Sequence, residues 1–172
     1  LRRGVIRLQQ PRRVAGGGLM SLGFENHETV LFQIQEMIRV EHIEQPDAVQ
    51  HEVDTYNELI PGAHELSATM FIEVVEADRA RDVLDFFVGL PQSGLTLGIG
   101  TAQIRAVFDL DQSNDRRVSA VQYLRFPLGE ALARRFCDPA LPAYLSIAHN
   151  GYAHRVALEG ATRLSLMEDL RA

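Results

Sequence analysis

Two expected helices between residues 25 and 61 carry ionisable side chains inside their apolar faces. Glu41 falls in the middle of the apolar arc of the first helix, and Glu52 lies between Ala48 and Tyr56 on the second. A carboxylate on such a face must be paired, hydrogen-bonded or protonated, because burying it alone is costly. This placement predicts a site that holds a polar group, and it does not specify a reaction.

An antiparallel arrangement of the two helices, turning at Gln45 and Pro46, would bring these acids together. Glu41 would come level with His51 and Glu52, and Arg39 would lie within reach of the second helix. Asn57 follows Tyr56 at the end of that helix. The predicted ligand-binding residues are Arg39, Glu41, Glu52, Tyr56, Asn57 and Arg125.

Arg125 enters this set through a strand. It points to the opposite face of that strand from Leu124 and Phe126. If that face packs on the helical pair, Arg125 becomes a counter-ion for Glu41 or Glu52. If the face meets solvent, Arg125 is an exposed arginine, and the sequence favours neither alternative.

The same cluster has other interpretations. Acids near an arginine on helices are usually structural ion pairs, and the cluster could also fix a homodimer across the helical pair. As a third alternative, oxygen and nitrogen donors together suit iron, manganese or zinc in a redox or hydrolytic enzyme. The residues of that metal set are Glu36, Glu41, His51 and Glu52. No spacing here has the specificity of a CxxC or HExxH motif, so whether the chain is an enzyme stays open.

The absence of lysine excludes several chemistries. All 17 basic residues are arginine. A Schiff base, including one with pyridoxal phosphate, therefore has no side-chain amine to use. A Walker-type nucleotide site and a protein kinase both lack their lysine.

Composition and charge narrow the class of protein. The 172 residues, 46% hydrophobic and 23% charged, predict one globular domain over residues 1–172. No apolar run is long enough to span a bilayer, and the single cysteine allows no internal disulfide, so we expect a cytoplasmic protein without a membrane partner. Five arginines precede the first acid, whereas the remainder is strongly acidic. This charge distribution argues against nucleic acid as a partner, and we expect the basic segment to lie on acids of its own chain or of a neighbour.

Periodicity and turn signals define the remaining elements. The first helix is expected over residues 28–44 with Asn26 as its N-cap, and the second from a capping box at Asp47 and Gln50 to Pro61. Further helices are predicted over residues 78–90, 130–136 and 162–170, and a plain turn over residues 109–117. Strands are predicted over residues 14–24 (a short hairpin turning at three glycines), 65–75, 95–99, 103–110, 118–128, 143–149 and 153–159. The last two form a hairpin about Asn150-Gly151.

This order of elements predicts an α+β fold. Strands joined by hairpin turns, with helices that do not alternate with them, indicate a mainly antiparallel sheet. The expected fold adds an N-terminal helical pair and a C-terminal helix to that sheet.

Several motifs resemble those of the bacterial "domain of unknown function" family numbered 3501. They are RRV (residues 12–14), FENHET (24–29), QIQEMIRVEHI (33–43), HEVDTYNELIP (51–61) and SAVQYLRF (119–126). The resemblance covers nearly the whole chain, and members of the family start further upstream, which implies that an N-terminal segment is missing here. The family has no established activity. The resemblance also implies rubrerythrin-like or iron–sulfur protein partners and a role in oxidative or metal stress.

Overall fold

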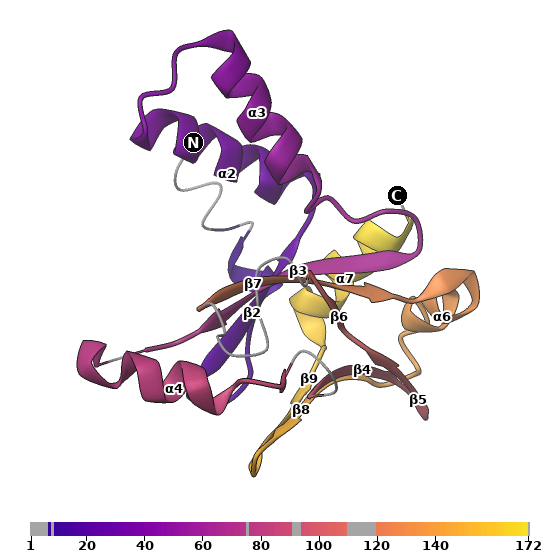
Figure 1. Ribbon diagram of the computed structural model, residues 1–172. Coiled ribbons are helices and arrows are strands. Elements are labelled where there is room, and N and C mark those ends of the chain that lie inside the picture. Colours follow the sequence, from indigo (N-terminus) through magenta and orange to yellow (C-terminus); the bar gives the residue numbers. More distant parts are fainter. Residues whose placement is uncertain (1–6, 8, 75, 91–93, 110–119, 172) are drawn as a thin grey trace.

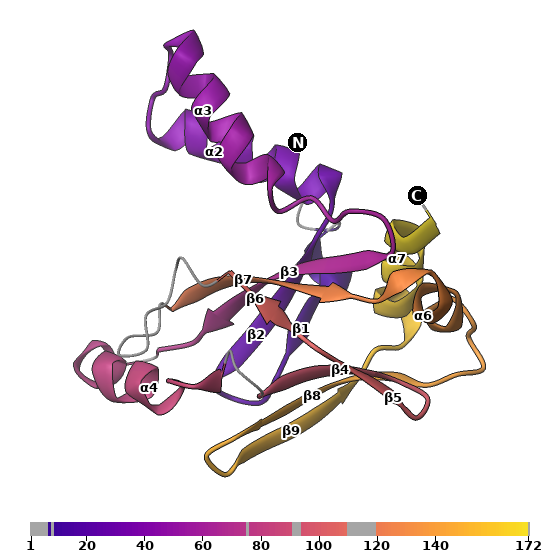
Figure 2. The same ribbon diagram turned by 45° about the vertical axis from the view of Figure 1, so that its right-hand side comes forward.

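The computed structural model describes residues 7, 9–74, 76–90, 94–109 and 120–171. Its strands form two antiparallel sheets, which confirms the predicted α+β class (Figures 1 and 2). The strands are β1 (Arg13–Ala15), β2 (Met20–Glu25), β3 (Glu65–Ile72), β4 (Leu95–Ile99), β5 (Ala102–Arg105), β6 (Val107–Phe108), β7 (Val121–Pro127), β8 (Ala143–His149) and β9 (Tyr152–Ala157). The helices are η1 (Gln10–Arg12), α2 (His27–Val40), α3 (Pro46–Asn57), η2 (Ala77–Arg79), α4 (Ala80–Phe86), α6 (Gly129–Phe136) and α7 (Gly160–Arg171).

The larger sheet has the strand order β1-β2-β3-β7-β6. Its long central pair, β3 and β7, aligns Ala68 with Leu124 and Leu66 with Phe126. These four side chains are buried on the inner face, while Tyr123 and its neighbours on alternate positions point to the outer face. The sheet therefore presents an apolar inner face and a more polar outer one.

The smaller sheet has the order β5-β4-β8-β9. The predicted hairpin of β8 and β9 is confirmed, with Asn150 at φ 48° and Gly151 at φ 83°. Positive φ at both turn residues matches the twist of the two strands, which is why an Asn-Gly pair is favoured there.

One predicted strand is divided between the two sheets. β5 pairs with β4 in the smaller sheet, whereas β6 pairs with β7 in the larger one. Between them, the N–H of Ala106 donates to the carbonyl of Leu95 over 3.0 Å. The expected single sheet is therefore two sheets, because the chain changes partner at Ala106. The end of this predicted strand, the turn at 109–117 and the start of the strand at 118–128 include residues outside the described part.

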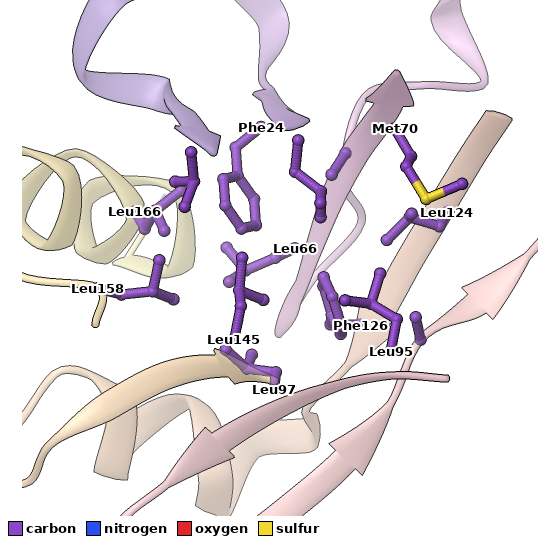
Figure 3. Packing of buried hydrophobic residues seen from close by; sticks show 14 of the residues in the cluster. Phe24, Leu66, Met70, Leu95, Leu97, Leu124, Phe126, Leu145, Leu158 and Leu166 are labelled. Atoms are coloured by element: carbon purple, nitrogen blue, oxygen red, sulfur yellow. The ribbon is translucent and has the colours of Figure 1, made fainter. Parts of the chain in front are cut away.

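The main core lies between the sheets and against α7. Figure 3 shows Phe24 and Leu66 of the larger sheet close to Leu166 of α7, with Leu97 and Leu145 of the smaller sheet beneath them. All five side chains are buried. The alternation of apolar residues along the strands thus places one face of each sheet in a shared core.

Two arginines of the basic N-terminal segment bind acids of the same chain, as expected. Arg12 is 2% exposed and forms an ion pair with Asp169 of α7, and it also donates to Ser165 Oγ over 2.7 Å and to the Phe24 carbonyl over 3.0 Å. Arg13 lies 3.5 Å from a carboxylate oxygen of Glu73. Arg12 thereby ties the start of β1 and the end of β2 to the C-terminal helix. Arg2 and Arg3 lie outside the described residues.

The helices α2 and α3 project away from both sheets (Figures 1 and 2). As predicted, Asn26 is the N-cap of α2: its side chain accepts from the Thr29 N–H over 2.9 Å, and Thr29 Oγ1 accepts from the Asn26 N–H over 2.9 Å. A small separate cluster of Val30, Ile34 and Leu59 holds the base of the two helices together. We call α2, α3 and their connection, residues 27–60, the arm. No helix of the described residues is long and apolar enough to cross a bilayer.

Two predicted helix boundaries in the arm are wrong. The first helix ends at Val40 rather than at residue 44, because His42 adopts a left-handed φ of 52° and the Ile43 N–H donates to the Ile38 carbonyl. This bond pattern closes a helix, although glycine is the more usual residue at the left-handed position. The second helix starts at Pro46 with Gln45 as its N-cap, so the capping box expected at Asp47 does not form.

Candidate ligand-binding site

Arg39 was expected to reach the second helix, but it does not. It is mostly exposed and pairs with Glu36 one turn earlier on α2, with 2.9 Å between Nη2 and the carboxylate. The hydrogen bond and charge of Glu36 raise the pKa of Arg39 above its ordinary value. This is a local surface ion pair, and such pairs contribute little to stability.

Glu41 is exposed rather than buried in an apolar arc. It is the C-cap of α2, and its N–H donates to the Met37 carbonyl over 3.0 Å. The helical projection placed it in the arc by assuming another turn of helix. Because the backbone turns at His42, the carboxylate of Glu41 meets solvent instead.

Glu52 is half-buried on α3, close to Tyr56. Burial raises the pKa of Tyr56, and the charges of Glu52 and Glu41 raise it further, while a hydrogen bond with Gln33 acts in the opposite direction. Both predicted acids therefore act electrostatically on Tyr56. Within the described part of the chain, neither acid forms an ion pair.

The predicted metal residues are not gathered into a ligand set. His51 is exposed, and its backbone carbonyl accepts from Thr55 Oγ1 over 2.8 Å. Among the residues described, no group of three or more histidine, cysteine, aspartate or glutamate side chains lies close enough to hold a metal ion. The described residues of the arm therefore do not bring the four predicted metal ligands together.

Arg125 does face the base of the arm, but its partners differ from those expected. Its guanidinium forms an ion pair with Glu65 and donates to the backbone carbonyls of Glu58 and Ile60. Arg125 thus connects β7 to the segment that follows α3. Of the two alternatives left open by the sequence, the face packed on the helices is the one observed, and Glu65 replaces Glu41 and Glu52 as the counter-ion.

A cavity of about 600 Å³ opens beside this arginine, between the C-terminal end of α3 and strands β6 and β7. It brings together two of the predicted ligand-binding residues, Tyr56 and Arg125, whereas Arg39, Glu41, Glu52 and Asn57 do not line it. Its lining residues are Thr55, Tyr56, Glu58, Leu59, Ser67, Val107, Phe108, Asp109, Tyr123, Leu124 and Arg125.

Two hydroxyl groups from the outer face of the larger sheet line this cavity. Ser67 of β3 is only 3% exposed, and its hydroxyl makes no hydrogen bond within the described part of the chain. Tyr123 of β7 is half-buried, and burial raises its pKa, as do nearby Tyr56 and Glu25. Because the Ser67 hydroxyl lies at the cavity wall and makes no hydrogen bond to the described residues, it is available to a ligand in this cavity.

A second cavity, of about 790 Å³, lies on the other side of α2 over β1 and β2. Its polar groups already bind one another: Arg13 lies near Glu73 and donates to Ser21, and Glu25 accepts from the hydroxyls of Thr29 (2.5 Å) and Thr69 (2.9 Å). Groups that are satisfied within the protein offer less to a ligand. The cavity beside Tyr123 is therefore the stronger candidate, although it is smaller.

Sequence reasoning missed Ser67 and Tyr123 as site residues. Strand alternation placed Tyr123 on the same face as Arg125, so its orientation could have been used. Ser67 gave no such signal, because it meets the cavity only through the register that pairs it with Arg125 across β3 and β7.

Comparison with known proteins identifies relatives of the whole chain. A family model described as "Protein of unknown function (DUF3501)" matches residues 1–170. A crystal structure of a novel protein of unknown function from Burkholderia pseudomallei is similar, with a TM-score of 0.89 and 30% identity, covering 98% of this chain and 89% of that one. The comparison with curated proteins found no match. The chain therefore belongs to the DUF3501 family, as the motifs in its sequence predict.

Proposed function

We propose that the chain is a small-ligand-binding protein whose ligand occupies the cavity between α3 and strands β6 and β7. The observation that supports this proposal is the Ser67 hydroxyl, which lies at the cavity wall and has no hydrogen-bond partner among the described residues. Ligand sites combine an apolar wall with a few converging polar groups, and this cavity has both.

The lining groups favour a ligand with hydrogen-bond acceptors. Tyr56 and Tyr123 have raised pKa values, so both hydroxyls stay protonated at neutral pH and can donate. Arg125 adds a cationic group already balanced by Glu65, while Leu59 and Phe108 supply an apolar wall. These features suit a small carboxylic acid, or its amide, with an apolar body.

Thermal unfolding in the presence of small carboxylic acids and their amides tests the proposal. A ligand at one hundred times its Kd stabilises the folded state by about 2.7 kcal/mol, which is readily measured. For a ligand found in this way, Tyr123→Phe and Ser67→Ala should each weaken binding by up to about tenfold, since each removes one hydrogen-bonding group.

Tyr144→Phe is the matched control for Tyr123→Phe. Tyr144 lies on β8 in the smaller sheet, where its ring packs 4.0 Å from the Arg155 guanidinium. It does not line the cavity, so its substitution should leave binding unchanged. Equal binding by the Tyr123→Phe and wild-type proteins would contradict the proposal, as would turnover in an activity screen without stabilisation by any compound.

The biological part of the proposal rests on the family resemblance. On that basis, we propose that the chain is a cytoplasmic accessory protein in oxidative or metal stress, with rubrerythrin-like or iron–sulfur proteins as partners. A strain lacking the gene should then be more sensitive to peroxide or to excess metal than its parent. Unchanged sensitivity, together with no co-purification of such partners with the tagged chain, would contradict this role without affecting the ligand proposal.

A further inference from the structure

The outer part of the arm, residues 35–58, has no buried side chain. We call it the distal arm. Its larger aliphatic side chains are half-buried, except for Val40, which is 59% exposed, and Ile38 and Val53 pack against the cluster of Val30, Ile34 and Leu59. The larger aliphatic side chains of the distal arm are Met37, Ile38, Val40, Ile43, Val49 and Val53. Isolated helices of this length are marginal in water, because most helical stability in proteins comes from burying an apolar face.

The distal arm also carries the whole net charge of the protein. It contains seven acids and one arginine, a formal charge of −6, and the remaining residues contain 16 arginines and 16 acids. Arg39 balances Glu36 within it. None of the other six acids forms an ion pair with a described residue; five of them are exposed and Glu52 is half-buried. The acids are Glu36, Glu41, Glu44, Asp47, Glu52, Asp54 and Glu58.

From this combination we infer that the distal arm is a docking surface for a positively charged protein partner whose contact surface has an apolar centre. Apolar side chains ringed by charges are the usual composition of a protein interface. Opposite charge on the partner would speed association and select against other proteins. The inference goes beyond ligand binding in the cavity.

Charge also decides which kind of partner fits the distal arm. A second copy would bring −6 against −6, and like charges across an interface cost several kcal/mol. Nucleic acids and membranes rich in anionic lipids are repelled for the same reason. A cationic protein surface is therefore the occupant that fits.

The test uses the full chain and a synthetic helical peptide with leucine on one face and arginine on the other. A peptide with glutamate in place of arginine is the control probe. We expect the arginine peptide alone to bind, with an affinity that falls as salt is added, and to slow amide hydrogen exchange at residues 35–58.

Variants of opposite sign sharpen this experiment. The triple variant Glu44→Gln, Asp47→Asn and Asp54→Asn should weaken peptide binding about tenfold, on the basis of exposed charge pairs. Arg39→Gln makes the distal arm more acidic and should strengthen binding a few-fold. Both expectations concern side chains that do not line the cavity, so ligand binding there should be unchanged.

A matched control removes the same charge elsewhere. The triple variant Asp78→Asn, Asp82→Asn and Asp85→Asn alters three exposed acids in η2 and α4, far from the arm in both views (Figures 1 and 2). It should bind the peptide like the wild type. Equal weakening by the two triple variants, protection outside the distal arm, or equal binding of the glutamate peptide would overturn the inference. A dimer that Val40→Ser dissociates would overturn it in favour of a second copy.

Discussion

The body of the protein and the arm differ in how much of their apolar surface they bury. In the body, two sheets and α7 enclose a large core in which Phe126, Leu66 and Phe136 are fully buried. In the arm, α2 buries Thr29, Val30 and Ile34, and α3 buries no side chain. The body therefore supplies the stability of the protein, whereas the arm is held mainly at its base and keeps its outer surface available.

The boundary between the two regions contains the candidate cavity. Tyr56 belongs to the arm, while Tyr123 and Ser67 belong to the outer face of the larger sheet. Sites at such boundaries can respond to small movements of one element against the other. The predictions below test the contrast between the regions and are ordered from the largest expected effect to the smallest.

Replacement of Arg12 should have the largest effect. Arg12→Met leaves Asp169 buried without its counter-ion, and breaking a buried pair in this way costs about 4 kcal/mol. Denaturant unfolding measures the loss. The double variant Arg12→Met, Asp169→Leu should recover most of it, because it removes the stranded charge; a double variant as unstable as the single one would show that packing, rather than charge, sets the cost.

A pair of leucines compares the regions directly. Leu66 is fully buried in β3, so Leu66→Ala should lower the free energy of unfolding by about 3 kcal/mol. Leu31 is 46% exposed on α2, and Leu31→Ala should change it by less than about 0.5 kcal/mol. Similar losses in the two variants would mean that the arm has a core comparable to that of the body.

The start of the arm depends on a cap. Asn26→Ala removes the side-chain oxygen that accepts from the Thr29 N–H, and N-cap losses of this kind cost about 1 kcal/mol. Hydrogen exchange should become faster in the first turn of α2 while β3 and β7 keep their protection. Asn26→Ser, which retains an N-cap acceptor and adds no charge beside Asp169, should lose much less.

Unfolding at alkaline pH tests the burial of the two tyrosines at the boundary between the arm and the body. Its effect on stability near neutral pH is the smallest of those predicted. The pKa values of Tyr56 and Tyr123 lie above the ordinary 10.0, mainly because burial disfavours the charged form. The contribution of these two protonated hydroxyls to the free energy of unfolding is present below pH 10. It is lost as the pH rises above 10, because the unfolded chain releases these protons first. The chain has no lysine to titrate in the same range.

Tyr123→Phe should make this alkaline loss of stability shallower. Urea unfolding at several pH values above and below 10 measures it. An unchanged slope in the variant would show that Tyr123 is not desolvated, and would weaken the case for the cavity as a ligand site.

Local signals in the sequence determined many elements of the fold. Asn150-Gly151 defined a hairpin because two consecutive positive φ values suit those residues. Asn26 defined the start of α2 because its side chain caps the backbone three residues later. Alternation along β7 identified its buried face, and the motifs of the chain identified its family. Each of these depends on residues that are neighbours in the chain.

Only the tertiary structure decided which distant groups meet. The projection of α2 indicated a buried Glu41, but a left-handed His42 ended the helix and left that carboxylate exposed. The pairing of β3 with β7 brings Arg125 into contact with Glu65 and places Ser67 at the cavity wall. Local patterns specify which face of an element is apolar, whereas the order and register of the strands decide what covers each face. The burial of a side chain and its charged partners depend on which element packs on its face, so they could not be predicted from the order of residues in the sequence.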